Sequence, residues 1–163
     1  MNVLNIHQRK LAASPAQVGA LIDSLASPRD LLSPRDAWPP MILDRPLGDG
    51  AVGGHGVIRY IVEAYEPGRS IVFRFTEPKG FDGTHRFDVV TEGETVMLRH
   101  SLAMKTRGRA VLSWPLLFRP LHDALLEDTL TNAERALGLE VHVMRWSPLV
   151  RLLRWMVARS RAA

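Results

Sequence analysis

Residues 83–105 read GTHRFDVVTEGETVMLRHSLAMK, and apolar residues alternate with polar ones on both sides of a Glu-Gly-Glu segment. This alternation is typical of two β-strands with one buried face, joined by a short glycine-containing turn. With Thr91 opposite Glu94, His85 lies opposite His100. Both histidines fall on the apolar face, together with Phe87, Val89, Val96, Leu98 and Leu102. The stretch therefore predicts a hairpin that carries two histidines into a protein interior.

A third histidine lies on a long helix predicted near the end of the chain. After an interrupted helical segment at Ala110–Arg119, which contains a proline, a continuous helix is expected over Leu121–Leu137, with Gly138 as its C-terminal cap. At about 100° per residue, His122 falls on the apolar face of this helix. That face also carries Leu126, Leu130, Ala133 and Leu137. The opposite side carries Asp123, Glu127, Thr131 and Glu134, and both Glu127 and Asp128 are expected to be solvated.

The N-terminal part of the chain predicts a strand followed by two short helices. Val3–Leu11 is the strand, with Leu4 and Ile6 as its expected buried positions. The segment Ser14-Pro15-Ala16-Gln17 then supplies an N-cap, a proline at the first helical position and a capping-box glutamine. A second short helix is expected around Pro28–Leu32, and a short strand near Met41–Asp44. The buried stripe of the first helix consists of Val18, Leu21, Ile22 and Leu25.

Two further strands flank the turn Glu66-Pro67-Gly68-Arg69. One face of this pair is expected to carry Ile58, Tyr60, Val62, Ala64, Ile71, Phe73 and Phe75. A sheet with one apolar face needs a cover, and only the last helix is long enough to provide it. We therefore predict an α+β helix-grip fold, in which a curved antiparallel sheet wraps around the long C-terminal helix and a small helix pair follows the first strand.

Composition limits the classes of protein to which the chain can belong. Its 163 residues suit one domain, and 46% hydrophobic with 23% charged residues is typical of a soluble globular protein. The absence of cysteine excludes disulfides and thiolate ligands. Because there is neither a secretory signal nor an apolar run long enough to span a membrane, a cytoplasmic location is expected.

The net charge of +4 is concentrated at the C-terminus. After Leu139 there is a single acidic residue, Glu140, against the arginines Arg145, Arg151, Arg154, Arg159 and Arg161. The preceding part is balanced in charge, whereas a nucleic-acid-binding surface needs a basic stripe. We therefore expect no nucleic-acid partner.

Several short motifs follow one another in a characteristic order between Asn2 and Gly138. They are Ser14-Pro15-x-x-Val18, Gly54-His55-Gly56…Arg59-Tyr60, Tyr65-Glu-Pro-Gly-Arg69, Gly83-Thr-His85-Arg-Phe87 and Arg119-Pro-Leu-His122-Asp-Ala-Leu-Leu-Glu-Asp128. On these motifs the chain resembles the START-like superfamily, also called SRPBCC, and most closely its bacterial polyketide cyclase/dehydrase-type branch. The resemblance implies a hydrophobic cavity between sheet and C-terminal helix that binds lipids, sterols or polyketides, and it implies no shared catalytic residues.

The inward histidines are the predicted polar contacts of that cavity. An imidazole can donate, accept or carry charge near neutrality, so the trio suits a ligand contact. The alternative is an enzyme of cyclase or dehydratase type that uses one of these histidines as general base, with Tyr60 as a partner. We predict no metal site and no cofactor, because no carboxylate is expected beside the trio. The predicted ligand-binding residues are His85, His100, His122, Tyr60, Phe73, Phe75, Phe87, Leu98 and Leu126.

The C-terminal extension, residues 139–163, is expected to form a separate basic amphipathic segment. Ser147-Pro148 begins a helix whose apolar stripe is Leu149, Leu152, Leu153, Met156 and Val157. We expect the apolar stripe to pack on the same domain or on a second subunit, as in a homodimer. The alternative is a peripheral membrane contact through Trp146–Arg161, because basic amphipathic helices that carry tryptophan can bind anionic membranes.

Overall fold

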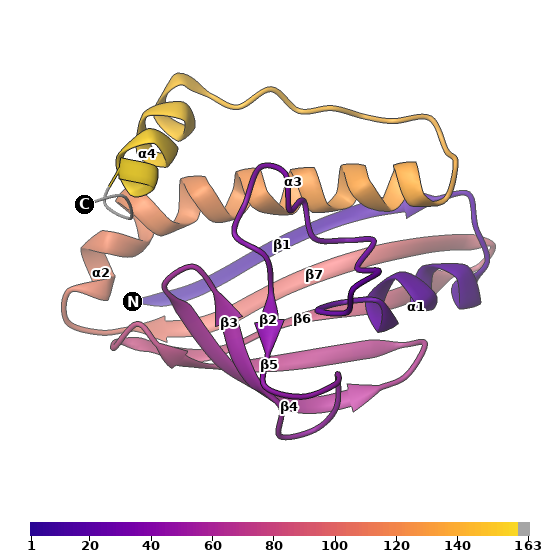
Figure 1. The fold of residues 1–163 in the computed structure, drawn as a ribbon, viewed down its shortest axis with the longest axis horizontal. Coiled ribbons are helices and arrows are strands. Elements are labelled where there is room, and N and C mark those ends of the chain that lie inside the picture. Colours follow the sequence, from indigo (N-terminus) through magenta and orange to yellow (C-terminus); the bar gives the residue numbers. More distant parts are fainter. Residues whose placement is uncertain (160–163) are drawn as a thin grey trace.

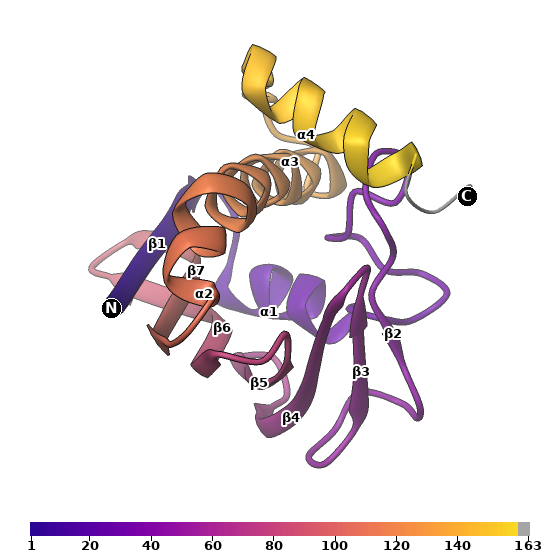
Figure 2. The same ribbon diagram turned by 90° about the vertical axis from the view of Figure 1, so that its left-hand side faces the viewer.

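Seven antiparallel strands form one sheet in the order β1-β7-β6-β5-β4-β3-β2. The computed structural model describes residues 1–159, and the side chains of residues 1–156. Figure 1 and Figure 2 show that the sheet curves, with β1 at one rim, β2 and β3 at the other, and the long helix α3 across the concave face. The strands are β1 Asn2–Leu11, β2 Ile42–Leu43, β3 Val52–His55, β4 Ile58–Glu66, β5 Ser70–Glu77, β6 Phe81–Glu92 and β7 Thr95–Thr106. This architecture confirms the predicted α+β helix-grip fold.

The covering helix follows a broken lead-in, as the sequence predicts. Helix α2 spans Ala110–Ser113, a π-helical turn spans Trp114–Phe118, and α3 runs from Arg119 to Ala136. A proline falls at the beginning of both the π-helical turn and α3, where its missing N–H disturbs the helical hydrogen-bond ladder least. Gly138 then adopts φ +68°, which ends the helix in the left-handed conformation that glycine accepts.

Helix α1, Pro15–Asp23, begins with the predicted capping box. The Ser14 side chain accepts from the Gln17 backbone, and the Gln17 side chain accepts from the Ser14 backbone. The prediction of a second helix at Pro28–Leu32 is wrong, because that segment forms turns and bends. The Asp30 carboxylate there accepts from the backbone N–H groups of Ala26, Leu32 and Ser33, and such local bonds compete with helix formation.

The register of the β6–β7 hairpin differs from the predicted one by two positions. Glu92 pairs with Thr95, so that Phe87 lies opposite His100, and His85 lies opposite Leu102. Gly93, with φ +59°, takes the first position of the two-residue turn. A shift of two positions keeps every side chain on its face of the sheet, so both histidines still point inward. In the β4–β5 pair, a bulge between Val62 and Ala64 turns Ala64 outward and pairs Tyr65 with Ile71.

Strand β1 turns the opposite face towards the interior from the one predicted. Leu4 and Ile6 are 71% and 52% exposed, so the prediction that they are buried is wrong. The inward positions are instead Asn5, His7 and Arg9, which reach carboxylates on α3. The physical reason is ion pairing between strand and helix, which allows polar side chains to occupy the covered face of the sheet.

The C-terminal segment packs on the domain. Residues 139–147 run back along α3, and helix α4, Pro148–Arg159, then lies beside it (Figure 1). Val150 and Leu153 are buried, whereas most of the expected stripe is exposed: Leu149, Leu152 and Met156. The side chain of Val157, and Arg161, lie outside the described residues. No helix within residues 1–159 is long and apolar enough to cross a membrane. A membrane or self-association contact through Trp146–Arg161 stays a prediction.

Candidate functional site

A cavity of about 320 Å³ lies between the concave face of the sheet and helix α3. The sheet contributes Phe75, Phe81, His85, Phe87, His100 and Leu102 to its wall. The helical side contributes Trp114, Leu117, Phe118, Leu121, His122, Leu125, Leu126 and Thr129. The stretch from the end of α1 to the first residue of β4 completes the wall with Leu25, Trp38, Met41, His55, Val57, Ile58 and their neighbours. The lining is therefore mostly apolar and aromatic, with four histidines among its few polar side chains.

His85 and His100 contact each other at this wall, as the sequence predicts. His85 Nδ1 lies 3.2 Å from His100 Nε2, and the two residues are 6% and 1% exposed. Burial lowers the pKa of both imidazoles well below the usual value, with smaller contributions from neighbouring histidines. Both rings are therefore neutral at pH 7, and one must donate a hydrogen bond to the other.

The neutral pair has a defined remaining hydrogen-bonding capacity. His85 Nε2 and His100 Nδ1 are buried and have no hydrogen-bond partner among the described residues. Whichever ring donates in the shared contact, one of these two nitrogens carries a proton and the other a lone pair. The pair therefore offers one donor and one acceptor, which suits a hydroxyl group or adjacent carbonyl and hydroxyl groups.

His122 joins the pair from helix α3, so the structure brings the predicted trio together. The His100 and His122 rings lie 5.2 Å apart between centroids, and both ring nitrogens of His122 are buried without a hydrogen-bond partner among the described residues. Burial lowers the pKa of His122, although the neighbouring Asp123 carboxylate opposes the shift. His122 is thus a neutral imidazole on the cavity wall.

The remaining predicted contacts divide into two groups. Phe75, Phe87 and Leu126 line the cavity. Tyr60, Phe73 and Leu98 are fully buried in the packed layer behind the wall. The Tyr60 ring lies 5.1 Å from the His85 ring, and Phe73 stacks on His85 at 4.9 Å. This second group therefore supports the orientation of His85, and its contact with a ligand stays a prediction.

Two functional candidates, His55 and His7, were missed in the sequence. His55 lines the cavity, and its Nδ1 lies 3.3 Å from the Tyr60 hydroxyl. Burial, with smaller effects of His122 and Arg59, lowers the pKa of His55 to about 4. It stands in a Gly-His-Gly segment that has no periodicity, so only its place in the family-like motif marked it.

His7 lies on the inward face of β1, between two carboxylates of α3. Its Nδ1 is 2.9 Å from Glu127 Oε1, and its Nε2 is 3.1 Å from Asp123 Oδ1. Burial lowers the pKa of His7, but the bonds to Asp123 and Glu127 outweigh burial and raise it. The expectation that Asp123 and Glu127 face away from the interior is therefore wrong.

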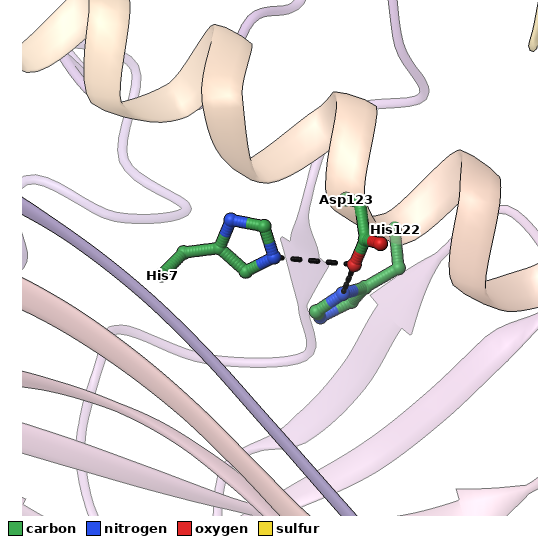
Figure 3. A group of neighbouring side chains, drawn as sticks. All are labelled: His7, His122 and Asp123. Atoms are coloured by element: carbon green, nitrogen blue, oxygen red, sulfur yellow. Dashed lines mark hydrogen bonds and ion pairs between the residues drawn. The ribbon is translucent and has the colours of Figure 1, made fainter.

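Figure 3 shows Asp123 between His7 and His122, with its carboxylate directed at both rings. Asp123 Oδ1 lies 3.6 Å from His122 Nδ1. Further along α3, Asp128 accepts from the indole N–H groups of Trp38 and Trp146, so the expectation that Asp128 is solvated is also wrong. These carboxylates do lie away from the apolar stripe of α3, as the helical periodicity predicts. They are nevertheless partly buried, because β1 and the C-terminal segment cover that side of the helix.

Comparison with solved structures finds the same fold at low sequence identity. A Thermobifida fusca protein has a TM-score of 0.63 at 15% identity, over 87% of this chain and 98% of its own. CalU16 from Micromonospora echinospora has a TM-score of 0.58 at 14% identity, over 98% and 85% of the two chains. A norcoclaurine synthase from Thalictrum flavum, a point mutant in complex with a transition-state analogue, has a TM-score of 0.56 at 16% identity, over 80% and 95%.

These similarities confirm the α+β helix-grip fold. At 14–16% identity they show the fold alone, so the resemblance to the START-like (SRPBCC) superfamily rests on the sequence motifs. No protein-family model and no curated protein matches the sequence. Because one fold hosts many functions, the function must be argued from the cavity of this chain.

Proposed function

We propose that this protein binds a hydrophobic or amphipathic small molecule, such as a lipid, a sterol-like compound or a polyketide, between its sheet and α3. The observation that carries the proposal is the cavity of about 320 Å³ with its mostly apolar wall. Pockets for small organic ligands are concave, mostly apolar and larger than about 300 Å³, with a few polar groups that fix orientation. The cavity meets each of these criteria.

The polar groups of the wall define what the ligand should carry. His85 and His100 are neutral and together offer one donor and one acceptor, and His122 adds a further imidazole on the facing helix. None of these side chains presents a permanent charge to the cavity. The preferred ligand is therefore an uncharged apolar molecule with a hydroxyl or carbonyl group, rather than an anion.

Catalysis of the cyclase or dehydratase type is the second candidate, and one observation favours it. His122 is the lining histidine with a carboxylate behind it, since Asp123 Oδ1 lies 3.6 Å from its Nδ1. A carboxylate in this place stabilises the imidazolium that forms when the ring accepts a proton from a substrate. The norcoclaurine synthase of the same fold is an enzyme by its name, so the fold is compatible with catalysis.

Native mass spectrometry of the purified full-length chain, followed by solvent extraction, tests the binding proposal. The expected result is a bound mass of a few hundred daltons, or one that appears when the chain is exposed to a mixed lipid extract, with one molecule per chain. Replacing His100 with Leu should weaken the binding of a ligand that carries a hydroxyl group. The change His142→Gln, at an exposed histidine, should leave that binding unchanged. A chain that takes up no apolar molecule in either setting would contradict the proposal.

The same recovered ligand separates binding from catalysis. If the protein is an enzyme, the ligand is converted during incubation and His122→Gln abolishes the conversion while binding is retained. If the protein is a binder, the ligand is recovered unchanged from the wild-type protein and from the variant.

A further inference from the structure

Three potential metal ligands converge where β1 meets the first turns of α3. They are one imidazole from the strand, His7, and an imidazole and a carboxylate from adjacent helix positions, His122 and Asp123 (Figure 3). Asp123 Oδ1 lies 3.1 Å from His7 Nε2 and 3.6 Å from His122 Nδ1. One ligand atom from each residue lies within 4.8 Å of the other two.

We propose that His7, His122 and Asp123 bind a divalent transition metal ion such as Zn²⁺. Zinc binds imidazole nitrogen and carboxylate oxygen at about 2.0–2.2 Å, so neighbouring ligand atoms of a tetrahedral site are about 3.4 Å apart. The two measured separations from Asp123 Oδ1 lie on either side of that value. Small side-chain movements would therefore complete three ligand positions and leave the fourth for water or another ligand.

Glu127 occupies the position of an outer-shell partner in this arrangement. Its Oε1 lies 2.9 Å from His7 Nδ1, the ring nitrogen that does not face Asp123. A carboxylate that accepts from the second N–H of a metal-binding histidine fixes its tautomer and raises its basicity. Glu127 therefore keeps the proton on Nδ1 and leaves the lone pair of His7 Nε2 available for the metal.

Unpartnered atoms at the same place provide an independent reason to expect a ligand. His122 Nδ1 is buried and has no hydrogen-bond partner among the described residues, and the same holds for Asn5 Oδ1. Asn5 Nδ2 donates to Asp123 Oδ1 at 2.9 Å, so its amide lies directly beside the cluster. Buried polar atoms are normally paired, and a cation would satisfy the imidazole nitrogen and attract the amide oxygen once the amide rotates.

The ligand types select the metal. Two imidazoles with one carboxylate suit Zn²⁺, Co²⁺ and Ni²⁺ better than Mg²⁺ or Ca²⁺, which prefer oxygen ligands alone. Because the His122 ring also forms part of the cavity wall, the metal would fix the orientation of that wall. It would also join the beginning of α3 to β1, at the edge of the ligand cavity.

Without a metal, the same atoms form an ion-pair cluster, with the His7 ring between Asp123 and Glu127. The two states differ in a measurable way, because only a metal site binds Co²⁺ or Zn²⁺ stoichiometrically. The test is calorimetric titration of the chelator-treated full chain with Zn²⁺, together with the visible absorption spectrum of the Co²⁺-loaded protein. The expected result is one ion per chain and the intense visible bands of four-coordinate Co²⁺.

Single substitutions then assign the ligands. His7→Gln, His122→Gln and Asp123→Asn should each weaken Zn²⁺ binding at least about a hundredfold, and Glu127→Gln by about tenfold to a hundredfold. The matched control is His142→Gln, because His142 forms another histidine–carboxylate pair, with Glu134, but its side chain is 68% exposed and lies outside the cluster. This control should bind Zn²⁺ like the wild-type chain.

Absence of stoichiometric binding by the wild-type chain would overturn the proposal and leave an ion-pair cluster only. Equal weakening by His142→Gln and His7→Gln would overturn it as well, because binding would then occur at surface histidines. If a ligand variant does not fold, the Co²⁺ spectrum of the wild-type chain and the Glu127→Gln titration still decide between the two states.

Discussion

His85 Nδ1 lies 3.2 Å from His100 Nε2, across the β6–β7 hairpin and within the wall of the cavity. The two residues are not directly opposite in the register, since His85 pairs with Leu102, so the contact runs diagonally between the strands. It joins two buried neutral rings, each of which keeps one nitrogen without a hydrogen-bond partner within the described part of the chain. A buried polar pair of this kind costs stability in the empty protein and is useful when a ligand completes its hydrogen bonds.

Replacing one or both histidines with leucine should therefore show how much stability the unpartnered polar groups cost. The single variant His100→Leu leaves both nitrogens of His85 unpartnered and should lower the free energy of unfolding by about 1–3 kcal/mol. The double variant, with His85→Leu added, removes both polar groups and should be at least as stable as the single one. Urea unfolding of both variants checks this. A double variant that is less stable than His100→Leu would contradict this reasoning.

The cavity histidines should make the protein sensitive to acid. The folded-state pKa of His55 is lowered to about 4, and those of His85, His100 and His122 are also lowered. In the unfolded chain the histidine pKa is about 6.5, so below that pH the unfolded chain binds protons that the folded chain does not. The contribution of these histidines to the free energy of unfolding is therefore fully present above about pH 6.5 and is lost as the pH falls towards about 4. His55 alone should contribute a loss of about 2.5 kcal/mol by pH 4.5.

Urea unfolding at pH 7.5 and pH 4.5 measures this loss. His55→Gln should reduce the difference between the two pH values, whereas the exposed control His142→Gln should keep the wild-type difference. An identical acid loss in wild-type protein and His55→Gln would show that His55 is not held neutral by burial.

Arg9 should contribute more to stability than a surface arginine. Its Nη1 lies 2.7 Å from Glu134 Oε1, and Glu134 is 2% exposed. Arg9→Met leaves this carboxylate buried with His142 as its remaining partner, which should cost about 3 kcal/mol. The control Arg74→Met breaks an exposed pair with Glu63 and should cost less than about 1 kcal/mol. Chemical denaturation compares the two, and equal losses would argue against the inward orientation of β1.

Arg154 should hold helix α4 on the domain. Its guanidinium lies 4.6 Å from the Trp38 ring and 3.7 Å from the Trp146 ring, and it donates to the carbonyl of Ala37. A cation–π contact contributes about 0.5–2 kcal/mol, so Arg154→Ala should speed amide exchange in α4 by up to about thirtyfold. Arg151→Ala, at an exposed position, is the control. Hydrogen-exchange mass spectrometry measures both, and equal exchange in the two variants would show that Arg154 does not hold the helix.

The fold could be predicted because its main signals are local. Three signals each act within a few residues: the capping box at Ser14, the alternation on either side of Gly93, and the prolines at the beginning of the π-helical turn and of α3. The hairpin register was two positions off, since the turn type and not the alternation decides it. The predicted inward direction of the histidines is still confirmed, because a register shift of two positions leaves each side chain on the same face of the sheet.

The inverted face of β1 could not be predicted in this way. Leu4 and Ile6 follow the usual pattern of buried strand residues, yet Asn5, His7 and Arg9 point inward because carboxylates from α3, more than a hundred residues later, pair with them. Periodicity carries no information about such a partner. The same long-range pairing brings His7 to Asp123, so the candidate metal site was invisible in the sequence.

A side chain that fills the space between the sheet and α3 shows whether that space is a ligand cavity. Leu121 lines the cavity, whereas Leu116 lies five residues earlier and is 68% exposed. Titration with the neutral fluorescent probe N-phenyl-1-naphthylamine should show one saturable site per chain. Leu121→Trp should weaken binding of the probe by about tenfold or more, equivalent to about 1.4 kcal/mol, whereas Leu116→Trp should bind the probe like the wild type. Probe binding that is absent from the wild type, or unchanged by Leu121→Trp, would contradict the proposal of a ligand cavity.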